Sequence, residues 1–175
     1  MPSDEKNALL GRTIAGKFAI ESVIGQGAMG VVYKAKQVAL DKAIAIKVMH
    51  RSPRTSSGGT PPTNDKSGPM SGDEMFAARF LREAKAASRI DHPNSMRVID
   101  FGEEPDGLLY MAMEHLDGRD LFSVIKDEFP LPPTRVLDIL MQALAAVAAA
   151  HDMGVVHRDL KPENIMVMKG TDDEG

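Results

Sequence analysis

The sequence predicts an α+β fold, with an antiparallel sheet and one helix first and a helical part after it. Residues 17–49 contain short runs of Val, Ile and Ala interrupted by glycine, which is typical of small strands joined by tight turns. From Thr134 to Met153 apolar residues recur at helical spacing instead, and Gly154 follows as a helix cap. The 175 residues, 43% hydrophobic and 26% charged, suffice for one core and little more than one domain.

A first helix is predicted from Gly72 to about Ile90. Ser71 and Glu74 have the spacing of a capping box. The face expected to be buried is the stripe Phe76, Phe80, Ala87 and Ile90. After this helix, His92 is expected to organise a turn. A hairpin then follows, because the runs 97–101 and 108–114 flank the turn sequence Glu-Pro-Asp-Gly.

These elements divide the chain into three parts. Residues 1–16 are expected to be an N-terminal extension, residues 17–117 the β-rich part, and residues 118–175 the helical part. Within the β-rich part, residues 51–72 are rich in Ser, Thr, Pro and Gly and predict a flexible surface insertion.

Charge and composition exclude several functions. The net charge of −4 gives no overall attraction to nucleic acid. With 0 Cys there is no disulfide framework, thiolate nucleophile or Cys-ligated zinc. The N-terminus lacks the pattern of a secretory signal, and no run of about 18 apolar residues predicts a membrane span. The expected location is the cytoplasm.

A glycine-rich loop is the first candidate for chemistry. Gly25, Gly27 and Gly30 stand in Gly-Gln-Gly-Ala-Met-Gly, where the missing Cβ atoms would let backbone N–H groups approach phosphate oxygens. The residues after Gly30 are β-branched and alternating, so the loop joins two strands and is not a dinucleotide fingerprint opening a helix. Taken alone, the motif is better explained by a flexible hairpin turn.

Lys47 and Glu83 are the second candidate. The strand period places Ile44, Ile46 and Val48 on one face and Lys47 on the other. Glu83 is the only charge on the predicted apolar stripe of the first helix, and a buried carboxylate needs a cation. We therefore expect Lys47 to pair with Glu83. The alternative is that the helix is rotated and Glu83 faces water.

The string His-Arg-Asp-Leu-Lys-Pro-Glu-Asn at residues 157–164 carries a family resemblance. Together with the glycine loop and Ala45-Ile46-Lys47, in this order and spacing, it resembles the protein-kinase signature set. A lysine two places after Asp159 resembles the pattern of serine/threonine kinases. The glycine loop is similar to that of bacterial eukaryotic-like kinases. The resemblance extends from about Lys17 to Val167 and implies a protein-kinase-like fold, with an N-lobe and hinge followed by an incomplete C-lobe.

The resemblance also implies a site for ATP and Mg²⁺ and a protein substrate with a Ser or Thr acceptor. The catalytic residues it implies are Asp159, Lys161, Lys47 and Glu83, with Asp159 accepting the substrate proton and Lys161 steadying the γ-phosphate. Asn164 would ligate Mg²⁺. The residues it places around ATP are Ile24, Gly25, Gly27, Gly30, Val32, Ala45, Lys47, Met113 as gatekeeper, Glu114 and Leu116 in the hinge, and Asp120 toward the ribose.

The chain departs from the family pattern at its metal triplet. Asp100-Phe101-Gly102 spells D-F-G, but it precedes the catalytic loop, so we interpret it as part of a strand. No D-F-G or activation loop follows Asn164, which predicts a chain that is inactive alone. The long helix is then expected to expose Val136, Leu140, Leu144 and Val147, a face that favours a partner chain. The alternative function is a pseudokinase-like nucleotide-binding or scaffold module.

Overall fold

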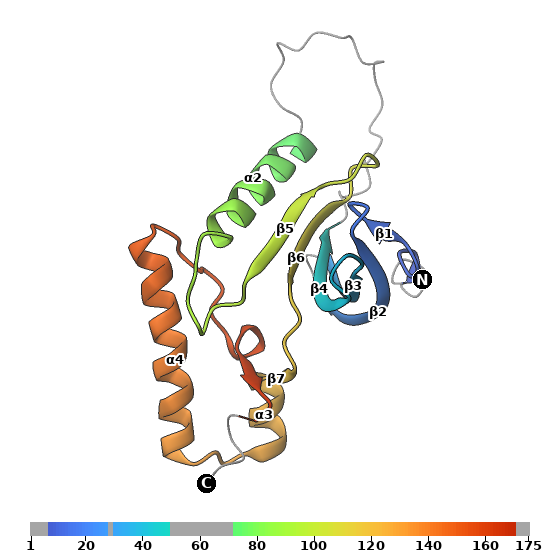
Figure 1. Cartoon of the computed structure of the whole chain (residues 1–175). Helices are drawn as coiled ribbons and strands as arrows, with labels where there is room; N and C mark the ends of the chain where they lie inside the picture. The colour runs from blue at the N-terminus through green and yellow to red at the C-terminus, as the bar shows by residue number, and fades with distance from the viewer. Residues whose placement is uncertain (1–6, 28–29, 50–71, 171–175) are drawn as a thin grey trace.

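A six-stranded antiparallel sheet dominates the first half of the chain in the computed structural model, which describes residues 7–27, 30–49 and 72–170 (Figure 1). Along the sheet the strand order is β1-β2-β3-β4-β6-β5. Its strands are β1 (Thr13–Ile14), β2 (Phe18–Gly27), β3 (Gly30–Gln37), β4 (Lys42–Met49), β5 (Val98–Glu103) and β6 (Leu109–Glu114). Residues 51–71 of the predicted insertion, which include the capping residue Ser71, lie outside the described residues, and Gly72 is the first residue of a helix.

The main core lies on one face of this sheet and follows the predicted alternation. Ile44, Ile46 and Val48 of β4 are completely buried there, and Val31 and Tyr33 of β3 join them. Since β3 and β4 run side by side in antiparallel register, two sets of alternating residues interleave to fill this core. The prediction of an apolar face on residues 44–48 is confirmed.

The last residues of the predicted N-terminal extension pack onto the sheet. Leu9 and Ile14 are buried in the main core, and β1 pairs with β2. Arg12 forms ion pairs with Asp106 at 2.6 Å and with Glu104 at 3.4 Å, both at the turn between β5 and β6. This segment therefore links the β1 edge of the sheet to the turn between β5 and β6.

Helix α2 (Gly72–Ala87) lies along β5 and β6 and begins where the sequence predicts (Figure 1). Its buried residues are Ala77, Phe80 and Ala84, and a second core cluster joins Ala77 and Phe80 to Met49 and Leu109 of the sheet. The predicted stripe through Phe76 and Glu83 is wrong in phase by roughly a quarter of a turn, because Ala77 and Phe80 are the residues that pack against Met49 and Leu109. As expected, His92 organises the following turn, accepting a hydrogen bond from the Asn94 N–H at 3.1 Å on Nδ1.

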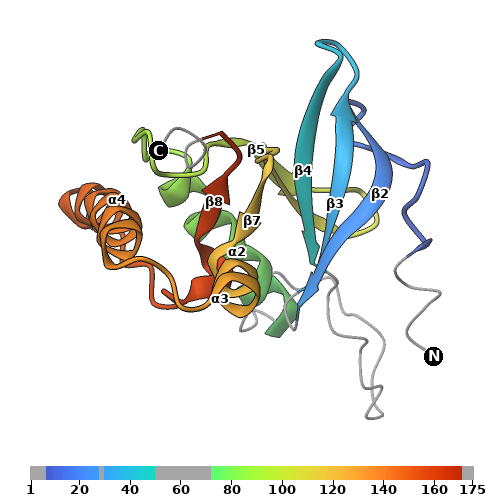
Figure 2. The same ribbon diagram turned by 90° about the horizontal axis from the view of Figure 1, so that it is seen from below.

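The remaining elements lie beneath the sheet. The two short strands β7 (Gly118–Asp120) and β8 (Met166–Met168) pair antiparallel, and α3 (Leu121–Glu128) follows β7 directly (Figure 2). The 3₁₀ turn η1 (Pro162–Asn164) forms the end of residues 157–164, the HRD string named after its first three residues, His157, Arg158 and Asp159. The sequence predicts helices after Gly118 but not these two strands.

Helix α4 (Pro133–Asp152) lies on the side away from β2, β3 and β4 in both views (Figure 1, Figure 2). Gly154 ends it with a positive φ of 72°, as predicted for a cap. Asn94 Nδ2 donates to Gln142 Oε1 at 2.9 Å and ties this helix to the loop after α2. Three of the four residues expected to be exposed are exposed, namely Val136, Leu140 and Leu144, while Val147 is half-buried.

Among the described residues, α4 alone is long and apolar enough to cross a membrane by length and composition. One helix of this kind is weak evidence for a membrane span.

Candidate active site

The face of the sheet opposite the main core brings together several of the predicted site residues. Antiparallel pairing aligns Gly25 with Val32, Val32 with Lys47, and Lys47 with Met111. Directly opposed residues point to the same face, so this row crosses four strands on one side. In a neighbouring row, Ala45 of β4 is opposed to Met113 of β6, and both side chains are buried.

The glycines of the loop serve different purposes. Gly30 has a φ of +146°, and a Cβ there would lie 2.1 Å from the carbonyl oxygen of Val48. Glycine at this position is therefore required by the close approach of β3 and β4. Among the residues that the structure describes, a Cβ on Gly27 would meet no atom within 4 Å, so that position is open toward them. Of the two, only Gly27 has the open surroundings that a phosphate group needs.

The expected pair of Lys47 with Glu83 is absent, and this prediction is wrong for the structure described. Glu83 is 59% exposed at its side chain and accepts a hydrogen bond from Arg79 Nε at 3.0 Å. No carboxylate in the described part of the chain forms an ion pair with Lys47, which lies half-buried on the sheet face. The physical reason is the rotation of α2, which turns Glu83 to water and leaves its nearest cation one helical turn away on the same helix.

The predicted hinge, residues 114–116, connects β6 to the lower part of the chain. The Glu114 N–H donates to the Arg97 carbonyl oxygen at 3.0 Å, and its side chain accepts from the Arg97 N–H at 2.6 Å. The N–H and carbonyl of Leu116 make no hydrogen bond with the residues that the structure describes, so both are available to a ligand.

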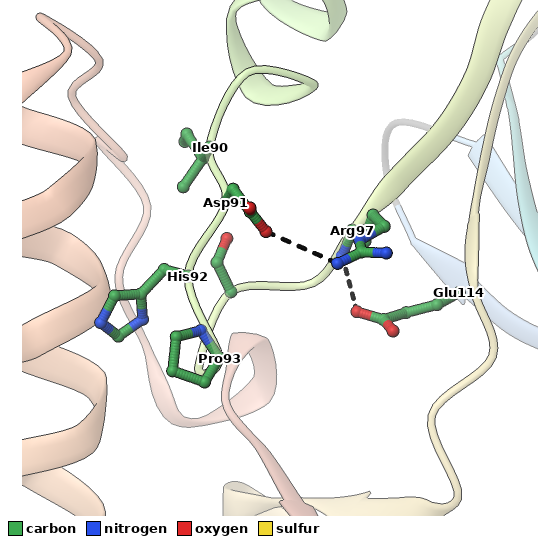
Figure 3. A pocket seen from close by; sticks show the side chains of 7 residues that line it. Ile90, Asp91, His92, Pro93, Arg97 and Glu114 are labelled. Carbon is green, nitrogen blue, oxygen red and sulfur yellow. Dashed lines mark hydrogen bonds and ion pairs between the residues drawn. The ribbon is translucent and has the colours of Figure 1, made fainter.

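A shallow polar pocket lies beside this hinge (Figure 3). Asp91, Arg97 and Glu114 line it, and the Arg97 guanidinium lies 3.5 Å from the Asp91 carboxylate. None of the predicted catalytic residues lines this pocket, and of the residues predicted to surround ATP it includes Glu114.

The HRD string gathers three predicted site residues into one cluster. Lys161 Nζ lies 3.1 Å from Asp159 Oδ2, and Asn164 Nδ2 donates to the same oxygen at 3.1 Å and to the Asp159 carbonyl oxygen at 2.7 Å. Two hydrogen bonds lower the pKa of the Asp159 carboxyl, and the bond from Lys161 has a larger effect than the bond from Asn164. Asp159 is therefore an ionised acceptor at neutral pH, and a positive φ of 63° at Arg158 turns the chain just before it.

Asp120 caps helix α3. Its Oδ1 accepts from the Ser123 N–H and its Oδ2 from the Ser123 hydroxyl, both at 2.8 Å. The hydrogen bond from the Ser123 backbone, followed by that from its hydroxyl, lowers the pKa of Asp120. Both carboxylate oxygens already have a partner, so a ribose hydroxyl would have to share one of them.

The D-F-G triplet at 100–102 lies within β5, which confirms its interpretation as part of a strand. Asp100 accepts a hydrogen bond from Lys17 Nζ at 2.9 Å and so joins the turn between β1 and β2 to β5.

The donor chemistry fits a magnesium ion only in part. Within the described residues no group of three His, Asp or Glu side chains forms a metal site. Asn164 uses its amide nitrogen toward Asp159, which leaves its carbonyl oxygen as one ligand. Mg²⁺ in such sites is commonly held by one or two protein oxygens plus substrate phosphates, so Asn164 fits a metal that arrives with a nucleotide.

Two contacts at the site were not expected from the sequence. They are the cap from Asp120 to Ser123 and the pair of Arg79 with Glu83. The signals were present, because Asp-x-x-Ser has N-cap spacing and Arg79 precedes Glu83 by four residues, the distance that brings helix neighbours together.

Comparisons with known proteins agree with the motifs. The family model described as "Protein kinase domain" matches residues 18–172. The chain is 44% identical over 167 residues to the serine/threonine-protein kinase pkn3 of Myxococcus xanthus, covering 95% of this chain and 27% of that protein. It is 38% identical over 159 residues to PrkC of Bacillus subtilis, covering 91% of this chain and 22% of that protein.

Solved structures agree on the fold. The crystal structure of the Mycobacterium tuberculosis PknI kinase domain matches with a TM-score of 0.71 and 33% identity, covering 93% of this chain and 58% of that one. The chain thus spans about a quarter of the length of the curated relatives and over half of a solved kinase domain. The antiparallel sheet, the HRD cluster and these matches agree with one another. The chain therefore belongs to the protein kinase family, among the bacterial serine/threonine kinases.

Proposed function

We propose that this chain binds ATP between the Lys47 face of the sheet and the HRD loop, as the nucleotide-binding part of a serine/threonine protein kinase. The single observation that carries the proposal is the cluster of Asp159, Lys161 and Asn164. It combines one ionised acceptor with one cation and one amide within hydrogen-bond distance. Phosphoryl transfer needs this set, because such reactions depend on positioning and on neutralising charge more than on a nucleophile of the protein.

In the proposed reaction Asp159 orients the substrate hydroxyl and accepts its proton as the oxygen attacks the γ-phosphate. Lys161 neutralises charge on the transferred group, and Lys47 contacts the α- and β-phosphates. Mg²⁺, when bound with ATP through Asn164, supplies further neutralisation. We also propose a catalytic part for Glu83, in a conformation where it pairs with Lys47.

The remaining nucleotide contacts are proposed from residue position. The glycine loop covers the phosphates, the hinge backbone meets the adenine, and Asp120 lies toward the ribose. The residues proposed to line this site are Ile24, Gly25, Gly27, Gly30, Val32, Ala45, Met113, Glu114 and Leu116. The open space at Gly27 and the unused backbone groups of Leu116 support this arrangement.

Isothermal titration of the chain with ATP and Mg²⁺ tests the proposal. We expect saturable binding that Lys47→Met weakens at least tenfold, which corresponds to about 1.4 kcal/mol. Lys42→Met is the matched control, because Lys42 lies on the same strand but is exposed and outside the proposed site. Equal affinity of the parent and Lys47→Met would refute the proposed site.

We propose that the 175-residue chain alone has almost no phosphotransfer activity. No D-F-G follows its catalytic loop, and losing a metal ligand in such a site costs several powers of ten in rate. Incubation with labelled ATP and a generic basic protein is expected to give background incorporation. Turnover well above background that Lys47→Met abolishes would contradict this.

A second candidate is a pseudokinase-like nucleotide-binding or scaffold module, favoured by the apolar face of α4. Val136, Leu140 and Leu144 are exposed on that face, and a partner chain with a complementary apolar surface would cover them. Light scattering during an ATP titration separates the two candidates. A defined complex that forms with nucleotide favours the module, and a monomer favours the kinase part.

We further propose that residues 17–117 form the N-lobe and hinge, that residues 118–175 form the beginning of the C-lobe, and that the protein works in the cytoplasm, where ATP is available. The change from the six-stranded sheet to the β7 and β8 region after the hinge supports this division.

A further inference from the structure

We propose that helix α2 presents, on its exposed side, a contact surface for an anionic phospholipid membrane. The contact residues are Arg82, Lys85 and Arg89, which we call the basic stripe. At this surface the chain lies on the membrane and does not span it. The inference goes beyond the proposed ATP site and uses none of its residues.

The basic stripe lies on the side of α2 that faces away from the sheet. Ala77, Phe80 and Ala84 are buried toward the sheet, whereas all three residues of the basic stripe are exposed. At about 100° per residue, the three cations fall within roughly 60° of one another around the helix axis, and roughly 140° from the centre of the buried side. Figure 1 shows β5 and β6 along one side of α2, which leaves the stripe on its outer side.

Arg89 continues the line of the helix although α2 ends at Ala87. The Ser88 N–H still donates to the Ala84 carbonyl oxygen at 2.9 Å, and the Arg89 N–H donates to the Ala86 carbonyl oxygen at 3.2 Å. The helical path therefore extends to Arg89. The stripe spans seven residue steps, or roughly 10 Å.

The acids on either side of the basic stripe are already paired with other cations. Glu83 accepts a hydrogen bond from Arg79 at 3.0 Å, and Asp91 lies 3.5 Å from the Arg97 guanidinium. In the part of the chain that the structure describes, no carboxylate forms an ion pair with the basic stripe. The charges of the stripe are therefore open to neutralisation from outside the chain.

The spacing of the three cations is unfavourable for the helix itself. Lys85 follows Arg82 by three residues, and Arg89 follows Lys85 by four. Like charges at these spacings repel each other on a helix surface. Lys85 in the last turn complements the helix dipole, but Arg82 lies before that turn. An anionic partner removes the repulsion, so the pattern favours a binding role over a role in helix stability.

The shape of the stripe favours a flat partner over a peptide. The three side chains stand on the convex outer surface of a helix, and none of them lines the polar pocket beside the hinge. A peptide is commonly held in a groove, whereas a row of cations on a convex surface can meet a flat anionic layer. Met75 and Ala78 continue the same line toward the start of α2, and both are exposed, Met75 to 59%. Their apolar groups suit the boundary between headgroups and acyl chains.

The net charge of the chain makes this attraction local. At −4 the whole chain is repelled by an anionic surface, so binding depends on the stripe and on salt. Each Lys or Arg near such a surface strengthens binding about fivefold. Loss of two cations should therefore weaken binding about 25-fold.

Co-sedimentation of the chain with vesicles is the test. One set of vesicles contains phosphatidylcholine and phosphatidylglycerol in a ratio of three to one, and the other contains phosphatidylcholine alone. We expect the parent to bind the anionic vesicles only, and added salt to weaken this binding. The double variant Arg82→Gln/Lys85→Gln should bind about 25-fold less tightly.

The double variant Lys42→Gln/Lys126→Gln is the matched control. Both lysines are exposed, lie on β4 and α3, and form no ion pair with the described residues. The control therefore changes the net charge by the same two units as the stripe variant, but away from α2. We expect it to bind nearly as the parent does. Far-UV circular dichroism verifies that all proteins are folded.

Three outcomes would overturn the inference. The first is a folded parent that does not bind the anionic vesicles. The second is equal weakening of vesicle binding by the stripe variant and the control. The third is binding of a polyglutamate peptide that depends on the stripe, without binding of vesicles, which would assign the surface to an acidic protein. Because no arm contains nucleotide, failure of the proposed ATP site in its own titration leaves this result unaffected.

Discussion

Replacing single glycines of the loop with alanine separates the structural and the ligand-binding roles of that loop. At Gly30 the added Cβ would lie 2.1 Å from the Val48 carbonyl oxygen and 3.1 Å from its carbon, and φ is +146°. An alanine forced into a backbone region nearly exclusive to glycine costs about 1–3 kcal/mol. Moving β3 away from β4 to relieve the clash weakens a backbone hydrogen bond by about 1 kcal/mol.

We therefore expect Gly30→Ala to lower the free energy of unfolding by about 3 kcal/mol. For a chain of this size each kcal/mol shifts Tm by about 2–4 °C, so Tm should fall by about 6–12 °C. Thermal unfolding followed by far-UV circular dichroism is the assay, because the chain has 0 Trp for fluorescence.

Gly27→Ala is the matched control. Its Cβ meets no atom of the described residues within 4 Å. Reduced entropy of the unfolded chain stabilises such a variant by about 0.4–1 kcal/mol where its conformation is compatible. Its ATP binding is expected to weaken, because the methyl group occupies the open space. If Gly30→Ala melts at the parent Tm, or if Gly27→Ala loses as much stability as Gly30→Ala, the assignment of separate roles is wrong.

Three further predictions concern stability. Leu9→Ala should lower the free energy of unfolding by about 2–4 kcal/mol in urea titrations, because Leu9 is buried in the main core. Leu10→Ala is the control and should change the free energy of unfolding little, because Leu10 is exposed. Equal effects of the two variants would mean that residues 9–16 are not part of the core. Asp120→Ala should cost about 1 kcal/mol at pH 7 by loss of the α3 cap. Hydrogen bonds from Ser123 lower the pKa of Asp120 in the folded chain, so its contribution to stability is present above about pH 4 and is lost as pH falls through the folded pKa. The difference in free energy of unfolding between the parent and Asp120→Ala should therefore narrow in acid. A difference that does not change with pH would contradict the assigned cause. Arg12→Ala should cost about 0.5–1 kcal/mol through its pairs with Asp106 and Glu104, and the difference should shrink in 1 M salt; a cost unaffected by salt would mean that packing dominates.

The sequence predicted most elements because their signals are local. The alternation of Ile44, Ile46 and Val48 determines one face of β4, and the apolar spacing after Thr134 determines α4. The HRD string is a short segment, and its internal contacts among Asp159, Lys161 and Asn164 need only local backbone geometry.

The orientation of α2 could not be predicted in the same way. Its sequence offers two apolar stripes through Phe80, and the choice depends on Met49 and Leu109, which lie on distant strands. The pair of Lys47 with Glu83 depended on that choice and was therefore wrong. For a similar reason β7 and β8 were missed, because each has three residues and its partner lies far along the chain.

Hydrogen–deuterium exchange with and without MgATP tests the central claim most directly, because it reads both halves of the proposed site in one experiment. We expect nucleotide to slow amide exchange in β2 and β3 next to the glycine loop, at Leu116, and in residues 157–164 together. Protection confined to the pocket at Asp91 and Arg97, or to one half of the site alone, would contradict the claim that the sheet face and the HRD loop hold one nucleotide between them.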